Sequence, residues 1–233
     1  MIIQEVFRVL YSPFKAFQKL AKTPDVKGPV FILLITLLAS LSAQYVNASR
    51  TLIETEKGSQ VYVPISATHI FSDQIVPALT EATFRFFLNW LIYGVAFLLV
   101  LKLFRAKEGA WHHLFIIIGY TFIVAAIFIL VNVIIVSTFP TVKLEFDVWN
   151  GASEGNEEML DQMIQKYEQA WGSLFVYKLR PYFLMVVATW TAALGAIAVH
   201  FLREVSWNKA LVISAIVSVI SWFLAGPLSF YYL

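Results

Sequence analysis

The sequence predicts an all-α polytopic membrane protein with five transmembrane helices, an N-terminal amphipathic helix pair and a small external α/β cap. Three observations lead to this fold class. Of the 233 residues, 59% are hydrophobic and 14% are charged, against roughly 25% charged residues in an average soluble domain. The mean hydropathy is +0.73. Finally, five apolar runs come close to or exceed the roughly 20 residues that a helix needs to cross a bilayer.

The five apolar runs define the domain organisation. They predict spans at about 29–45, 86–103, 114–137, 182–202 and 210–231. A cytoplasmic amphipathic segment over 1–28 then precedes a membrane domain over 29–233, whose two external loops lie at about 46–82 and 138–181. The first run has some features of a signal peptide, but the 28 residues before it are long for the charged region of such a peptide. We therefore expect a retained span.

Basic residues indicate the orientation, because short loops rich in Lys and Arg stay in the cytoplasm. The N-terminal segment, the loop after the second span and the loop after the fourth span are short and basic. Their cations are Arg8, Lys15, Lys19, Lys22, Lys27, Lys102, Arg105, Lys107, Arg203 and Lys209. The two longer loops carry an acidic excess. We expect a cytoplasmic N-terminus and an external C-terminus.

The N-terminal segment has an amphipathic helical pattern that Ser12-Pro13 divides in two. Its apolar residues recur at spacings of four and three: Ile3, Phe7, Leu10, Phe14, Phe17 and Ala21. Lys15, Lys19 and Lys22 line another face. This pattern is typical of a helix that lies on an anionic inner leaflet, and equally of a cover that packs under the bundle. Both interpretations can hold at once.

A charged elbow separates these helices from the first span. In "TPDVKGP", two prolines and a glycine end one helix and begin the next. Asp25 or Gly28 can cap the new helix, and Pro29 suits its first turn. The elbow therefore sets the angle between the N-terminal helices and the first span.

The long loops predict the external cap. Val142–Val148 alternates apolar and polar residues, which is typical of a strand, and Thr51–Glu56 with Gln60–Ile65 can supply a hairpin. Asn156 can cap a helix that runs to about Trp171. We interpret this cap as solvated and without a ligand.

A polar stripe on the second span and one polar residue on the third form a candidate pocket. Arg85 and Asn89 lie one helical turn apart, and Asn132 is expected at similar depth. The three side chains can bind a lipid headgroup or pass a small solute near the outer face. Alternatively, the Arg85 side chain extends to the membrane–water interface, and the amides of Asn89 and Asn132 form hydrogen bonds between helices. We favour this structural interpretation.

Small residues recur every four positions on the fourth span, at Ala188, Ala192 and Ala196. Ser214 and Ser218 repeat the spacing on the fifth span. Small residues at this spacing allow helices to approach closely in lipid. We expect a tight antiparallel pair of the fourth and fifth spans.

The sequence offers no catalytic machinery. The absence of cysteine excludes thiolate catalysis and cysteine-based metal sites. His112 and His113 point about 100° apart on a helix, so they are a poor pair of ligands for one metal. No activated nucleophile or phosphate-binding loop is recognisable. We expect no enzyme, no cofactor and no metal, and a net charge of +2 is too small to suggest nucleic acid as a partner.

Two short motifs resemble the Yip family of Ypt/Rab-interacting membrane proteins. They are "SPFKAFQKLAKTPDVKGPVFILL" at the head of the first span and "GAWHHLFIIIGYTF" in the third. The residues that carry the resemblance most clearly are Asp25, Gly28, Pro29, Gly119 and Tyr120. The five-span layout agrees, so the resemblance covers most of the chain.

The resemblance implies a trafficking role between endoplasmic reticulum and Golgi in the eukaryotic members, with related membrane proteins and Rab GTPases as partners. This chain departs from those members in its short cytoplasmic segment, which argues against a Rab-type GTPase as partner. The short segment resembles the prokaryotic branch, and it implies a prokaryotic cell membrane.

Two hypotheses for the function follow. The leading one is a non-enzymatic protein that organises membrane or partner proteins, with membrane lipids, anionic ones included, and homo- or hetero-oligomers as its partners. The alternative is a small transporter or channel that uses the polar pocket of Arg85, Asn89 and Asn132.

Overall fold

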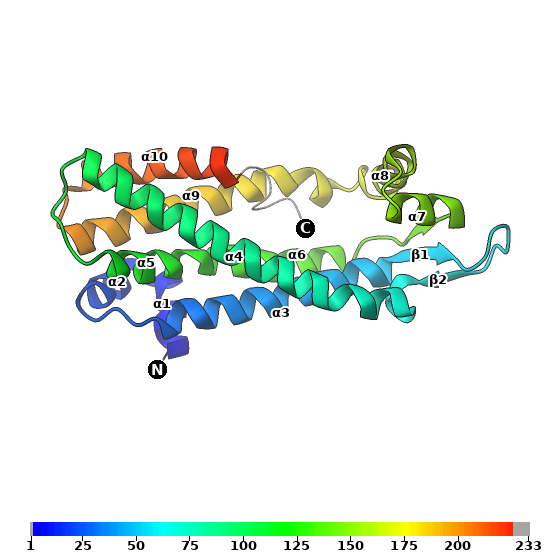
Figure 1. Ribbon diagram of the computed structural model, residues 1–233, viewed down its shortest axis with the longest axis horizontal. Helices are drawn as coiled ribbons and strands as arrows, with labels where there is room; N and C mark the ends of the chain where they lie inside the picture. The colour runs from blue at the N-terminus through cyan, green and yellow to red at the C-terminus, as the bar shows by residue number, and fades with distance from the viewer. Residues whose placement is uncertain (1, 226–233) are drawn as a thin grey trace. The chain divides into compact units, whose positions relative to one another are not determined.

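Five long apolar helices dominate the computed structural model, which describes residues 2–225 (Figure 1). The spans are α3 (Lys27–Arg50), α4 (His69–Leu103), α5 (Trp111–Gly119) continued through the 3₁₀ turn η2 (Tyr120–Phe122) into α6 (Ile123–Val136), α9 (Phe175–Arg203) and α10 (Trp207–Ala225). Each is long and apolar enough to cross a membrane. The predicted all-α polytopic fold is confirmed.

The first four spans are longer than the apolar runs that predicted them. Helix α3 continues to Arg50, α4 begins at His69 and α9 begins at Phe175, so parts of both predicted external loops are helical. Pro77 and Pro181 lie inside α4 and α9 without ending them. Hydropathy marks where a helix meets hydrocarbon, but it does not fix where the helix ends, which depends on capping and on packing. The predicted end of the last span, 226–231, lies outside the described residues.

The chain forms two compact units, which are described separately. The described parts of the first unit are 2–38, 81–129 and 184–225, and the second unit comprises 39–80 and 130–183. Every span except α10 contributes to both units.

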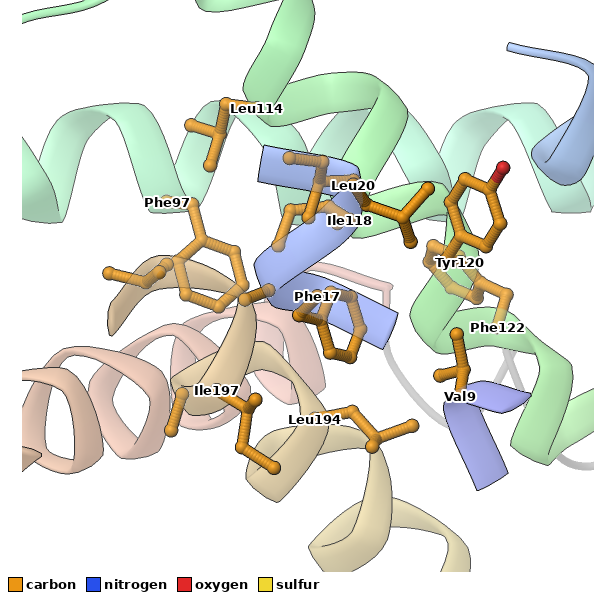
Figure 2. Packing of buried hydrophobic residues seen from close by; sticks show 14 of the residues in the cluster. Val9, Phe17, Leu20, Phe97, Leu114, Ile118, Tyr120, Phe122, Leu194 and Ile197 are labelled. Carbon is orange, nitrogen blue, oxygen red and sulfur yellow. The ribbon is translucent and has the colours of Figure 1, made fainter. Parts of the chain in front are cut away.

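The first unit contains the N-terminal helix pair, α1 (Ile2–Tyr11) and α2 (Pro13–Lys22). The break expected at Ser12 is present, with Ser12 at the N-cap position and Pro13 beginning α2. The ring of Phe17 is fully buried in the same cluster as Phe97 and Leu194 (Figure 2). The N-terminal helices are therefore part of the hydrophobic core of the first unit, as the interpretation of a packed cover expects.

The second unit contains a three-stranded sheet in the order β2-β1-β3. Strand β1 (Thr51–Glu54) pairs antiparallel with β2 (Tyr62–Pro64) and parallel with β3 (Val142–Leu144). The 3₁₀ turn η1 (Ile65–Ala67) follows β2, and α7 (Phe146–Ser153) and α8 (Glu157–Trp171) complete the small α/β cap. The predicted hairpin is present, and the Asn156 side chain caps α8 by accepting the N–H of Met159 at 3.3 Å.

The predicted strand over Val142–Val148 is wrong in its second half. The strand ends at Leu144, and Phe146 already begins α7. The buried carboxylate of Glu54 lies at this point, where it accepts the backbone N–H of Phe146 at 3.1 Å and that of Gln60 at 3.2 Å. A negative charge at a helix N-terminus stabilises the helix, and its partner here is distant in sequence.

Candidate functional site

The elbow before α3 is built around the backbone and side chain of Asp25. One carboxylate oxygen accepts the N–H of Lys27 at 3.0 Å, so Asp25 caps the new helix. The Asp25 carbonyl accepts the N–H of Gly28 at 3.4 Å and the hydroxyl of Tyr120 at 3.0 Å. Asp25 thus fixes the start of the first span and receives a hydrogen bond from the third.

Gly28 and Gly119 allow the elbow to contact the third span directly. A Cβ on Gly28 would overlap the Tyr120 ring, and a Cβ on Gly119 would lie 2.7 Å from Cγ of Pro29. Tyr120 is 2% exposed, and Gly28 and Pro29 are buried as well. These four residues and Asp25 carry the family resemblance, and the structure brings all five into one contact cluster, which we call the elbow lock.

The elbow lock coincides with the break in the third span. Helix α5 ends at Gly119, and η2 holds Tyr120 before α6 resumes the α-helix. Trp90 of α4 donates its indole N–H to the carbonyl of Phe115 at 2.7 Å, one turn before the break. A short 3₁₀ segment inside a helix often marks a functional hinge. The third span is therefore held at its break by the elbow and, one turn earlier, by α4.

The N-terminal helix pair has a buried face and an exposed apolar face. Val6 and Val9 of α1 are fully buried. The opposite residues Ile3, Phe7 and Tyr11, here called the α1 stripe, follow each other at four-residue spacing and are 55%, 37% and 71% exposed.

The other apolar residues of the helix pair lie in different surroundings. Phe14 of α2 is 52% exposed, and its ring meets Trp207 edge to face at 5.5 Å. Leu10, Phe17 and Ala21 pack in or against the core. The predicted apolar face thus divides between core and surface.

The three lysines of α2 have different environments. Lys15 and Lys22 are exposed. The ammonium of Lys19 lies 2.5 Å from the Glu5 carboxylate of α1, and Arg8 lies 3.4 Å from the same oxygen. Sequence reasoning missed Glu5, whose other carboxylate oxygen is buried without a hydrogen-bond partner among the described residues. Its sequence signal was that Glu5 is the single acid among residues 1–22, whose other charged side chains are basic.

The predicted polar pocket is divided between the two units. Arg85 belongs to the first unit and forms an ion pair with Glu81, with Nε 2.9 Å from the carboxylate oxygen. Asn89 is half-buried in the same unit. Asn132 belongs to the second unit and is buried. A pocket shared by the three side chains stays a prediction.

The small residues of α9 lie beside α10 in the first unit. Ser214 of α10 donates its hydroxyl to the carbonyl of Ala192 at 2.6 Å, and a Cβ on Gly195 would lie 2.9 Å from the same hydroxyl oxygen. Ala196 is buried and Ala188 is half-buried. Small residues therefore permit a local close approach of the two helices.

Metal-ligating side chains do not gather in the described part of the chain: no group of three or more His, Asp or Glu in it is placed to hold an ion. His112 and His113 lie next to each other at the start of α5, with ring centroids 4.4 Å apart. The residues with the most specific geometry are therefore those of the elbow lock and the helix pair attached to it.

Comparison with models of protein families matches residues 7–228 to the Yip1 domain. No curated protein and no solved structure matches the chain. The match includes the second half of α1, α2, the elbow and all five spans.

Proposed function

The chain belongs to the Yip1 family, and from this premise we propose that it is a non-enzymatic protein that organises its membrane and its partner proteins through the N-terminal helix pair. The observation that carries the proposal is the double-sided packing of α1. One side, with Val6 and Val9, is buried in the core, while the α1 stripe on the other side is exposed. Because one apolar side of α1 is buried in the core, the other apolar side remains available to bind a lipid surface or a partner.

The partner that fits this surface best is the inner leaflet of the protein's own membrane. The basic loops favour a cytoplasmic N-terminus, which brings α1 and α2 to that leaflet. The aromatic α1 stripe suits the boundary between headgroups and acyl chains, and the exposed cations Lys15 and Lys22 suit anionic lipid. The geometry therefore supports an interfacial helix that is also a packed cover.

The elbow lock gives the helix pair a fixed position. The Tyr120 hydroxyl holds the carbonyl of Asp25, and Pro29 fits against Gly119. Because the elbow contacts the break in the third span, force on α1 and α2 from lipid or from a partner is transmitted to the bundle. Assembly with a second copy or with related membrane proteins would use the same rigid unit.

The test compares two pairs of exposed apolar residues. Phe7→Ser with Tyr11→Ser removes most of the α1 stripe, and Leu160→Ser with Ile164→Ser removes a similar exposed pair from α8. Native mass spectrometry of protein extracted in mild detergent measures retained anionic lipid and oligomeric state. We expect the α1 variant alone to retain less anionic lipid than the wild type, or to lose its oligomeric state, while it still inserts into the membrane. Equal behaviour of the two variants would contradict the proposal.

A further inference from the structure

Arg203, the last residue of α9, is a buried cation that the elbow lock does not use. It is only 6% exposed, although it is one of the basic residues at the span ends that favour the cytoplasmic side. Its Nη2 donates to the carbonyl of Ala110 at 3.4 Å, which is a long hydrogen bond. Nε and Nη1 have no hydrogen-bond partner among residues 2–225. A planar guanidinium with five N–H donors is thus largely unused.

Gly109 accommodates this guanidinium. A Cβ on Gly109 would overlap Nη1 and lie 3.2 Å from Cζ of Arg203. The backbone before α5 therefore approaches the guanidinium so closely that a larger residue would displace it.

The acids near Arg203 do not neutralise it. Glu204, the next residue, forms an ion pair with Lys107 at 2.7 Å, and this pair joins the two loops. Glu108 makes no ion pair within the described chain. Arg203 makes no ion pair within the described chain, and a nearby anion stabilises a charge that is largely removed from water, so the site is electrostatically suited to an anion.

The start of α5 adds donors at the same place. Ala110 occupies the N-cap position and offers no side-chain acceptor to the N–H groups of the first turn, which begins at Trp111. Free N–H groups and the positive end of the helix dipole favour anions, phosphate above all. Two further cations precede α5: Lys102 near the end of α4 and Arg105 in the loop that follows.

We propose that Arg203 and the first turn of α5 bind a phosphate group. A guanidinium and phosphate oxygens form paired, charge-assisted hydrogen bonds, and this pairing supplies the missing counter-ion. The phosphate belongs to the headgroup of a phospholipid or to a free phosphate compound. The inference relies on the proposed orientation only for which leaflet supplies the lipid, and it does not involve the α1 stripe.

The experiment measures binding to detergent-purified protein by native mass spectrometry and by the shift in melting temperature. The probes are a short-chain phosphatidic acid, the diacylglycerol with the same chains, and inorganic phosphate. Arg203→Gln removes the charge, and Gly109→Ala displaces the guanidinium. As a control, Lys209→Gln removes an exposed cation from the first turn of α10.

We expect phosphatidic acid to bind more tightly than diacylglycerol, and both site variants to weaken that binding roughly tenfold or more. The control should keep its affinity. Binding of phosphatidic acid without inorganic phosphate identifies a lipid headgroup, and equal binding of both identifies a free phosphate compound. If Arg203→Gln does not fold, Arg203→Lys, which keeps the charge, is compared with Gly109→Ala instead.

Two results would overturn the proposal: equal binding of the two lipids, or unchanged phosphatidic acid binding in Gly109→Ala together with either Arg203 variant. Arg203 would then only join two loops. The variant that lacks Phe7 and Tyr11 should keep this phosphate site, so failure here and failure of the proposed function are distinguishable.

Discussion

The two units hold their segments together by different means. In the first unit, glycine lets side chains lie directly on backbone, as Tyr120 lies on Gly28 and Pro29 on Gly119. In the second unit, polar groups join the segments: Glu54 accepts two backbone N–H groups, and Trp171 donates to the carbonyl of Pro140 at 2.8 Å. The first unit should therefore be sensitive to added atoms and the second to lost hydrogen-bond partners.

The contrast agrees with the surroundings proposed for each set of contacts. Apolar helices in lipid gain little from hydrophobic burial, so close packing of small residues stabilises their association. The cap has short strands and a small core, and its carboxylates and hydroxyls satisfy buried backbone groups. Of the residues that carry the family resemblance, Gly28, Pro29, Gly119 and Tyr120 pack in the first way, whereas Asp25 acts through hydrogen bonds.

The largest effect is expected from Gly28→Ala. The added Cβ overlaps the Tyr120 ring, so the ring moves and the bond to Asp25 is lost, at a cost of about 3 kcal/mol. Thermal unfolding in detergent measures the loss. The control is Gly155→Ala in the second unit, where a Cβ meets no atom within 4 Å but φ is +85°, which costs about 1 kcal/mol. A smaller loss from Gly28→Ala than from Gly155→Ala would contradict the elbow lock.

Glu54→Gln should produce the next largest effect, confined to the second unit. The amide offers one acceptor where the carboxylate offers two, and it places an N–H₂ group opposite a donor, which costs about 2 kcal/mol. Hydrogen exchange should accelerate in the β1–β2 hairpin and at the start of α7. Glu56→Gln, an exposed position in the same hairpin, is the matched control. Equal exchange in both variants would show that Glu54 does not hold these segments.

Tyr120→Phe should have a moderate effect. It keeps the buried ring and removes only the hydroxyl that donates to the Asp25 carbonyl, at a cost of about 1 kcal/mol. Hydrogen exchange at the elbow should increase while the rest of the first unit keeps its protection. Tyr11→Phe removes an exposed hydroxyl from the same unit and should change nothing. Unchanged exchange at the elbow in Tyr120→Phe would mean that this hydrogen bond does not hold the elbow.

The smallest effect concerns pH and the second unit. Burial raises the pKa of Tyr167 above its usual value, although the hydrogen bond between its hydroxyl and Thr51, at 2.6 Å, opposes the shift. A raised folded-state pKa means that the stability from Tyr167 is intact below the unfolded pKa of about 10 and is lost as pH rises through the folded pKa. The tyrosinate absorbance of the wild type is measured against pH, and that of Tyr167→Phe is subtracted from it. The difference, which reports Tyr167 alone, should therefore rise with a midpoint above pH ~10. Titration at the ordinary pKa would contradict a buried Tyr167.

The sequence was sufficient for a fold with five apolar helices, but not for the contacts that those helices make. Hydropathy predicted five helices because each must satisfy its own backbone in lipid. It did not predict which residues of the N-terminal apolar face would be buried. Phe14 and Phe17 have the same periodic signal, yet one is 52% exposed and the other is fully buried, because only the tertiary packing of α2 distinguishes them.

Charges buried in the fold were the hardest features to predict. Glu54, Arg203 and Glu5 look like ordinary surface residues in the sequence, and two of them have partners far along the chain. One such partner lies where the predicted strand after Val142 becomes helical: Glu54 accepts the backbone N–H of Phe146, the first residue of α7. A pattern of neighbouring residues in the sequence contains no information about contacts between residues that are far apart in the chain.

The central claim is that the packed N-terminal helix pair lies on the inner leaflet through the α1 stripe. The chain contains no cysteine, so a single spin label can be placed at Tyr11→Cys and, as a control, at Val61→Cys in the hairpin, both exposed apolar positions. The measurement is accessibility to oxygen and to a water-soluble relaxant in anionic vesicles. The account predicts a lipid-embedded label at residue 11 and a water-exposed label at residue 61. Water exposure at both positions would contradict it.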